Sequence, residues 1–187
     1  MAQMSLGDRV ANERRRLKSV RQALSAALER GSRGEASYVP FYLAVADYIE
    51  TAMHRLHIQD VRMGDTIRKR LGGTLNQSQA QALSELDERL DGNQQYLKSF
   101  LDSRDALQER GAAAIGGFEE ASRAYTNYIT TNMGHHGATT DLARQLMTQD
   151  DWAFMASLTD EETRREQVLY DRVFAAVPST LPLPASA

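Results

Sequence analysis

Apolar residues recur at steps of three and four along most of the chain, which is the spacing of one face of an amphipathic α-helix. In the first stretch the face carries Val10, Leu17, Val20 and Leu24. Such stretches predict four long helices, at about residues 6–29, 39–71, 78–110 and 113–147.

Turn-forming residues separate these stretches. A glycine follows the end of the first three, and all four prolines lie outside residues 41–177, so nothing in that interval breaks a helix as strongly as proline does. Two capping signals lie near the C-terminus, Thr148 with Asp151 and Thr159 with Glu162. Each predicts the start of a short helix, the second of which carries Val168, Leu169, Val173 and Val177.

The pattern predicts an all-α protein. The alternation of apolar and polar residues that is typical of β-strands is missing, and long helices joined by short loops favour an antiparallel up-and-down bundle. We therefore expect a four-helix bundle with an additional C-terminal helix. Residues 1–177 would form this single domain, and 178–187 a flexible C-terminal tail.

Composition excludes several classes of protein. The chain has 187 residues, of which 42% are hydrophobic and 25% charged, and no cysteine, which removes disulfide frameworks, thiol catalysis and iron–sulfur clusters. The formal net charge of -3 gives no broad positive field for nucleic acid. No apolar run approaches the roughly 20 residues that a membrane span requires. We expect a cytoplasmic protein without nucleic-acid or membrane partners, and a homodimer is a possible assembly.

Polar residues interrupt the apolar stripes, and they carry the information about function. Glu13 keeps the spacing of the first stripe, Asp60 lies on the second with His57 one turn earlier, and His136 lies on the fourth. In an antiparallel bundle their axial levels differ by about one to two turns, roughly 6 to 12 Å, so one polar zone near the middle of the bundle is plausible. Gln94, Asn132 and Thr139 would be its hydrogen-bonding partners.

Two interpretations of this polar zone are open. Converging His, Asp and Glu side chains from facing helices are how bundles hold iron or manganese, with His57, Asp60, His136 and Glu13 as the candidate ligands. Alternatively, the same residues form a metal-free hydrogen-bonded network. Glu13 has a further alternative, a surface ion pair with Arg9 or Arg16. His54 lies on a mostly polar face, and the glycines beside His135 and His136 leave open which of those two points inward.

Two segments strengthen the first interpretation. The run from Phe41 to Met63, which contains Arg-Leu-His-Ile-Gln-Asp, and the His136 region followed by Leu-Met-Thr-Gln-Asp-Asp-Trp resemble a divergent hemerythrin-like, HHE cation-binding domain. The resemblance implies a non-haem, usually di-iron, centre; a mononuclear site and manganese are the alternatives that the residues themselves leave open. It also implies a role in oxygen or redox sensing, or in oxidative chemistry, with dioxygen or another small molecule as the partner.

The motifs depart from the family pattern in their spacing. The family repeats a His, three residues and a Glu, whereas here two residues separate His57 from Asp60. Four histidines are also fewer than a complete di-iron set of that family uses. Two other functions therefore stay open: a helical interaction module without enzymatic activity, and a bundle that binds a small molecule in place of the metal.

Overall fold

The computed structural model describes the backbone of residues 6–132 and 137–182, and the side chains from residue 12 onward within those ranges. These residues form helices, turns and loops, without a β-strand. The α-helices are α1 (Leu6–Arg30), α2 (Val39–Leu71), α3 (Gln77–Arg110), α4 (Ile115–Asn132), α5 (Gly137–Leu146), α6 (Gln149–Met155) and α7 (Asp160–Ala175). Short 3-10 turns, η1 (Ala36–Tyr38) and η2 (Gly111–Ala114), precede α2 and α4.

The helix ends follow from local chemistry. Helix α2 is capped after Leu71 by Gly72, which adopts a left-handed conformation (φ 66°) that glycine reaches without strain. Reciprocal capping boxes begin α6 and α7 at Thr148 and Thr159, as the sequence predicts. A third capping box, Asn76 with Gln79, starts α3.

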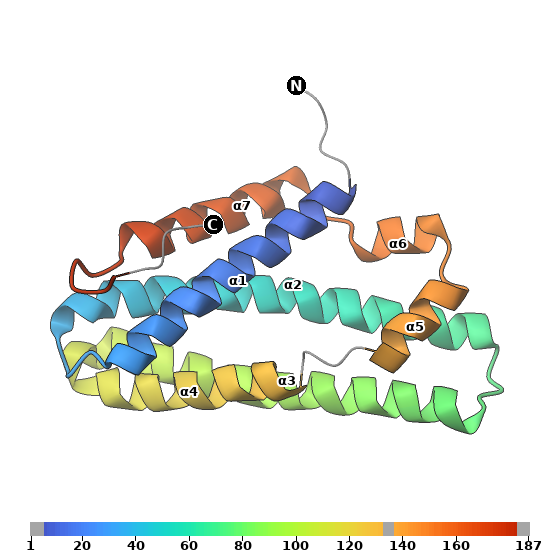
Figure 1. The fold of residues 1–187 in the computed structure, drawn as a ribbon, viewed down its shortest axis with the longest axis horizontal. Coiled ribbons are helices and arrows are strands. Elements are labelled where there is room, and N and C mark those ends of the chain that lie inside the picture. The colour runs from blue at the N-terminus through green and yellow to red at the C-terminus, as the bar shows by residue number, and fades with distance from the viewer. Residues whose placement is uncertain (1–5, 133–136, 183–187) are drawn as a thin grey trace.

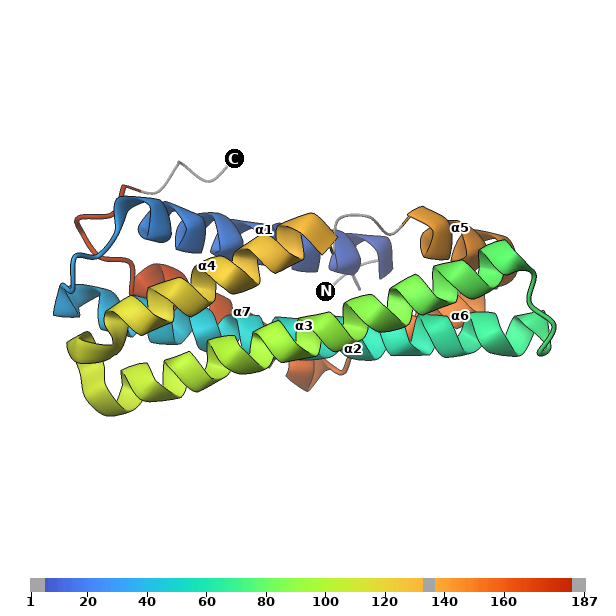
Figure 2. The same cartoon turned by 90° about the horizontal axis from the view of Figure 1, so that it is seen from below.

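Two long helices, α2 and α3, form the axis of the molecule and run antiparallel along its full length (Figure 1). Helices α1 and α4 cover one half of this pair, and chain direction alternates from α1 through α4. Helix α7 packs on α2 and α1, while α5 contacts α2 and α3 near their other end. The view from below places α4 and α5 over opposite ends of α3 (Figure 2).

Buried apolar side chains form two separate clusters along this axis. The main core lies under α1, α4 and α7, and on α2 its last fully buried member is Met53. The second core lies under α5 and α6, and on α2 it begins at Met63. On α3 the corresponding limits are Leu90 and Phe100. His57, Asp60 and Gln94 therefore fall in the polar interval between the two cores.

The fourth predicted helix, residues 113–147, is wrong in its extent. Helix α4 ends at Asn132 and a separate helix, α5, begins at Gly137. At the last described residue of α4, the Asn132 amide donates to the Tyr128 carbonyl at 3.1 Å. The apolar stripe of α4 thus stops at Ile129 and does not fix which way His136 points.

The chain after α7 differs from the expected tail in its first residues. Pro178 and Leu181 are buried, and Leu181 belongs to the main core. The rest of the predicted tail, 183–187, lies outside the described residues. No described helix combines the length and apolarity needed to cross a membrane.

Candidate functional site

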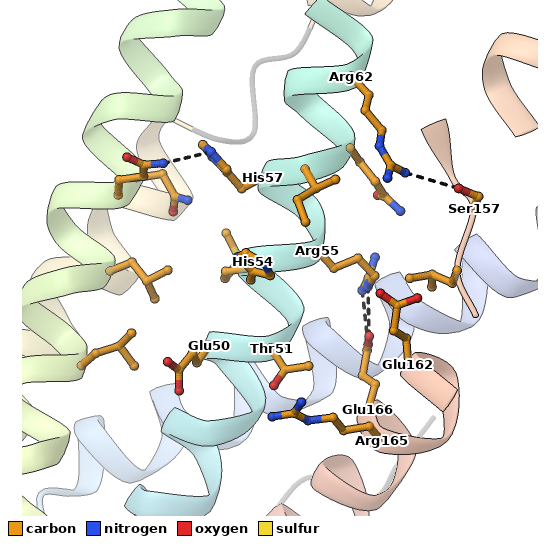
Figure 3. Close-up of a pocket in the computed structure, with 18 residues that line it drawn as sticks. Glu50, Thr51, His54, Arg55, His57, Arg62, Ser157, Glu162, Arg165 and Glu166 are labelled. Carbon is orange, nitrogen blue, oxygen red and sulfur yellow. Dashed lines mark hydrogen bonds and ion pairs between the residues drawn. The ribbon is translucent and has the colours of Figure 1, made fainter. Parts of the chain in front are cut away.

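A groove of about 590 Å³ runs along α2 between α3 and α7, on the side away from α1 (Figure 3). This volume is in the range of small-molecule sites. Its lining is mostly polar, with a few apolar side chains among the polar ones: Glu50, Thr51, Met53, His54, Arg55, His57, Ile58, Gln59, Arg62, Asn93, Gln94, Leu97, Leu101, Ser157, Leu158, Glu162, Arg165 and Glu166.

On the α3 side of the groove, His57 is tied to α3 through one ring nitrogen. Gln94 Nε2 lies 2.9 Å from His57 Nε2. With the amide nitrogen as the donor, His57 Nε2 accepts this bond, which leaves the second ring nitrogen, Nδ1, outside it. That Nδ1 atom is buried and has no hydrogen-bond partner among the described residues. His54, one turn earlier, is exposed, as the sequence predicts.

On the α7 side, Arg62 reaches the loop that joins α6 to α7. Its Nη1 donates to the Phe154 carbonyl and the Ser157 hydroxyl, both at 3.3 Å, and its guanidinium lies 4.9 Å from the Phe154 ring centroid. Gln59, one turn before Arg62 on α2, has a buried Nε2 that donates to no acceptor in the described part of the chain. This end of the groove therefore holds hydrogen-bond donors with spare capacity.

A buried charge network forms the inner wall. The Arg55 guanidinium donates from Nε and Nη2 to both carboxylate oxygens of Glu166, at 2.9 and 3.2 Å, and from Nη1 to Glu13 at 2.9 Å. The Tyr48 hydroxyl donates to the same Glu166 carboxylate at 3.3 Å. Burial, and next the Glu166 carboxylate, raise the pKa of Tyr48, which stays protonated as a donor. The network joins α1, α2 and α7.

The sequence indicated one member of this network and missed the others. Glu13 is buried as predicted, but its described partner is the Arg55 cation. Arg55 and Glu166 were not singled out, although both keep the spacing of buried positions. Arg55 follows Tyr48 and Ala52 at steps of four and three, and Glu166 precedes Leu169 and Val173 in the same way.

Asp60 lies outside the groove lining. Burial raises its pKa to about 6, and the Arg89 and Arg14 guanidinium groups oppose that shift only in part. A buried carboxyl group with a raised pKa is stabilised either by a bound proton or by a nearby cation.

The described residues do not assemble the iron centre that the family resemblance implies. No group of three or more His, Asp or Glu side chains among them is placed to hold a metal ion. The Glu13 carboxylate is compensated by Arg55, and His57 pairs with Gln94. His136, and His135 beside it, lie outside the described residues, so their part in a metal site stays a prediction.

Comparisons with known proteins give no relative: no family model, curated protein or solved structure matches this chain. The function therefore rests on the groove and the charge network themselves.

Proposed function

We propose that this protein is a small-molecule-binding helical bundle and that the groove between α2, α3 and α7 is its ligand site. The observation that carries the proposal is the pair of buried nitrogens on groove-lining residues, His57 Nδ1 and Gln59 Nε2, that lack hydrogen-bond partners within the described chain. A buried polar group without a hydrogen bond costs about 1 to 3 kcal/mol, and a ligand that accepts from it recovers that cost.

The apolar part of the lining supports the same function. Leu97 and Leu101 on α3, Ile58 on α2 and Leu158 in the loop before α7 line the groove and offer contact area to an apolar ligand. Ligand sites typically combine such surface with a few fixed polar groups. The Arg55 network holds α7 against α2 and so keeps the far wall in place.

Binding of a neutral apolar fluorophore, N-phenyl-1-naphthylamine, tests the proposal. We expect saturable binding to the folded protein, with a blue shift of the dye. Thr51→Phe, which fills the floor of the groove, and Leu97→Gln, which makes its wall polar, should each weaken binding about tenfold, whereas Leu75→Gln on the exposed loop after α2 should not. Equal binding by all four proteins, or no saturable binding at all, would contradict the proposal.

For the architecture, we propose that α1 to α4 form an antiparallel up-and-down four-helix bundle that α7 braces. The alternating chain directions and the contacts of α1 with α2, α2 with α3, α3 with α4 and α1 with α4 support it. A cytoplasmic setting is part of the proposal, since a chain without cysteine suits a reducing compartment.

A hemerythrin-like iron protein is the second candidate, and one observation favours it. His57 Nδ1 is a buried nitrogen without a described partner, and the hard-to-ionise Asp60 lies one turn further on the same helix. If bound, iron would supply oxygen or redox chemistry, and His57, Asp60 and His136 would hold it.

Metal analysis of protein purified without a histidine tag tests this candidate. If iron binds, His57→Ala and His136→Ala should each lose most of it, while His54→Ala should retain it. Less than about a tenth of an equivalent of iron, manganese or zinc after reconstitution, unchanged by His57→Ala, would exclude it.

A further inference from the structure

Donors and acceptors in the groove are engaged to different extents. Three carboxylates and three guanidinium groups line it, so their formal charges cancel. Their hydrogen bonds do not balance, because the carboxylates already accept from protein donors. A ligand can hydrogen-bond best to the donors and acceptors that make few or no hydrogen bonds within the protein.

Each carboxylate in the lining has protein partners. Glu166 accepts from Arg55 and Tyr48, as described above. Glu162 accepts from the Thr159 backbone N–H at 2.7 Å and from its hydroxyl at 2.9 Å, which is the capping box of α7. Glu50 accepts from the Arg104 guanidinium on α3. The carboxylates of Glu166 and Glu50 are thus paired with guanidinium groups, and that of Glu162 is held by its capping bonds.

The donors at the Arg62 end are less fully used. Arg62 makes two long bonds of 3.3 Å from a single nitrogen, to a carbonyl and a hydroxyl, and forms no direct ion pair within the described chain, although its charge helps to lower the pKa of Glu162. Gln59 Nε2, on the same helix one turn earlier, is buried and donates to nothing described. Residues three apart lie on one helix face, so both donors serve the same end of the groove.

A third cation lies away from this end. Figure 3 shows Arg165 beyond the Arg55–Glu166 pair, with its guanidinium turned toward Thr51. Arg165 makes no ion pair with the residues that the structure describes, but no buried unpartnered donor lies in its part of the lining. Ile58, Leu158 and the leucines of α3 provide the apolar surface of the lining.

We propose that the ligand of the groove is a small amphipathic monocarboxylate, with its carboxylate bound by Arg62 and Gln59 and its apolar body along Ile58, Leu158 and Leu97. This inference rests on the proposed function. A guanidinium and a carboxylate are planar and can form paired hydrogen bonds, and charge-assisted bonds are roughly twice as strong as neutral ones. Glu50 and Glu162 on the rim disfavour a more highly charged anion.

Displacement of N-phenyl-1-naphthylamine by three eight-carbon probes, octanoate, octan-1-ol and octylamine, tests the charge preference. We expect octanoate to displace the dye at about tenfold lower concentration than either other probe. Gln59→Leu and Arg62→Gln should each remove most of this preference while the dye still binds, because the apolar walls are unchanged. Gln59→Leu also keeps the contacts of Arg62 with the α6–α7 loop, so it covers the case in which Arg62→Gln disturbs that loop. Arg165→Gln, which removes the same charge from the other end of the groove, should keep the preference.

The outcomes separate this inference from the proposed function. If the dye binds the groove and the three probes displace it equally, the site stands and the carboxylate preference is overturned. If Arg165→Gln removes the preference and Gln59→Leu does not, the placement of the carboxylate is overturned. If the dye does not bind, or binds the groove variants as it binds the unmodified chain, the proposed function fails and this inference fails with it.

Discussion

Arg55 on α2 and Glu166 on α7 face each other through two hydrogen bonds, of 2.9 and 3.2 Å, although 111 residues separate them in the chain. Both side chains are almost fully buried, and Glu13 from α1 takes a third bond of the same guanidinium. Two carboxylates thus share one buried cation. Arg16, whose guanidinium lies 5.9 Å from the Tyr170 ring, adds positive charge nearby and helps to lower the pKa of Tyr48 against its burial.

We expect Arg55→Met to lower the free energy of unfolding by about 3 to 5 kcal/mol, because it leaves two buried carboxylates without their cation. Arg172→Met is the matched control. Arg172 lies on α7 and pairs with Asp47 at 3.9 Å across an exposed surface, so its loss should change stability by about 0.5 kcal/mol or less. Urea unfolding followed by circular dichroism measures both. Equal, small effects would mean that the network does not hold α7.

The sequence predicted which side chains are buried better than it predicted their interaction partners. Helix α2 has the predicted bounds, since Pro40 at its start and Gly72 after its end act locally. Glu13 was placed correctly on a buried face. The sequence does not predict that Arg55 is the partner of Glu13. Arg55 lies on a second buried face of α2, which can be recognised only once α1 and α7 are packed against it. Periodicity gives the direction of a side chain within one helix, whereas an ion pair between helices depends on how they pack.

The end of α4 is a second feature that the periodicity of the sequence did not predict. A continuous stripe from Phe118 through Ile129 suggested that the helix continued to residue 147. The structure instead places α5 on α2 and α3, where Ala143 and Met147 complete the second core. The predicted stripe therefore joined residues that belong to two helices. The groove lies between α2, α3 and α7, so the apolar pattern of any single helix does not predict it.

Asp60 should make the protein more stable in mild acid. Its pKa is raised by burial from 3.8 to about 6, so between these values the folded state binds more protons than the unfolded state, and this group adds stability as pH falls. Asp60→Asn should therefore raise the free energy of unfolding at pH 7 by up to about 3 kcal/mol and flatten its change between pH 7 and 4.5. The exposed Asp65→Asn is the control. Parallel pH profiles for Asp60→Asn and the unmodified chain would contradict the assignment.

Glu119 should have the opposite pH dependence. Burial by itself would raise its pKa, but hydrogen bonds from the Ser32 backbone at 3.0 Å and the Tyr42 hydroxyl at 2.7 Å, with Arg123 nearby, hold the pKa below the usual 4.5. The stabilisation is complete above pH 4.5 and is lost as pH falls through the lowered pKa. Glu119→Gln should cost about 1 to 3 kcal/mol at pH 7 and progressively less below pH 4.5. Thermal unfolding across this range measures it, and a constant difference would contradict the mechanism.

Gly92 on α3 is expected to resist substitution by alanine because of Tyr128 on α4. A Cβ at position 92 would collide with the Tyr128 hydroxyl and its ring carbons. That ring cannot move freely: its hydroxyl donates to the Arg89 carbonyl at 3.0 Å, and it stacks on Tyr96 with centroids 4.6 Å apart.

We expect Gly92→Ala to lower the free energy of unfolding by about 1 to 3 kcal/mol, against the helix-propensity gain of up to about 1 kcal/mol that alanine normally brings. Gly116→Ala near the start of α4 is the control, since its added Cβ meets nothing within 4 Å beyond its chain neighbours and its own helix backbone, and only the gain should appear. Because the two residues collide, the effects of Gly92→Ala and Tyr128→Ala on the free energy of unfolding should not be additive. In a Tyr128→Ala background, Gly92→Ala should become neutral or stabilising, and an unchanged cost in a double-mutant cycle would place its cause elsewhere than at the contact of α3 with α4.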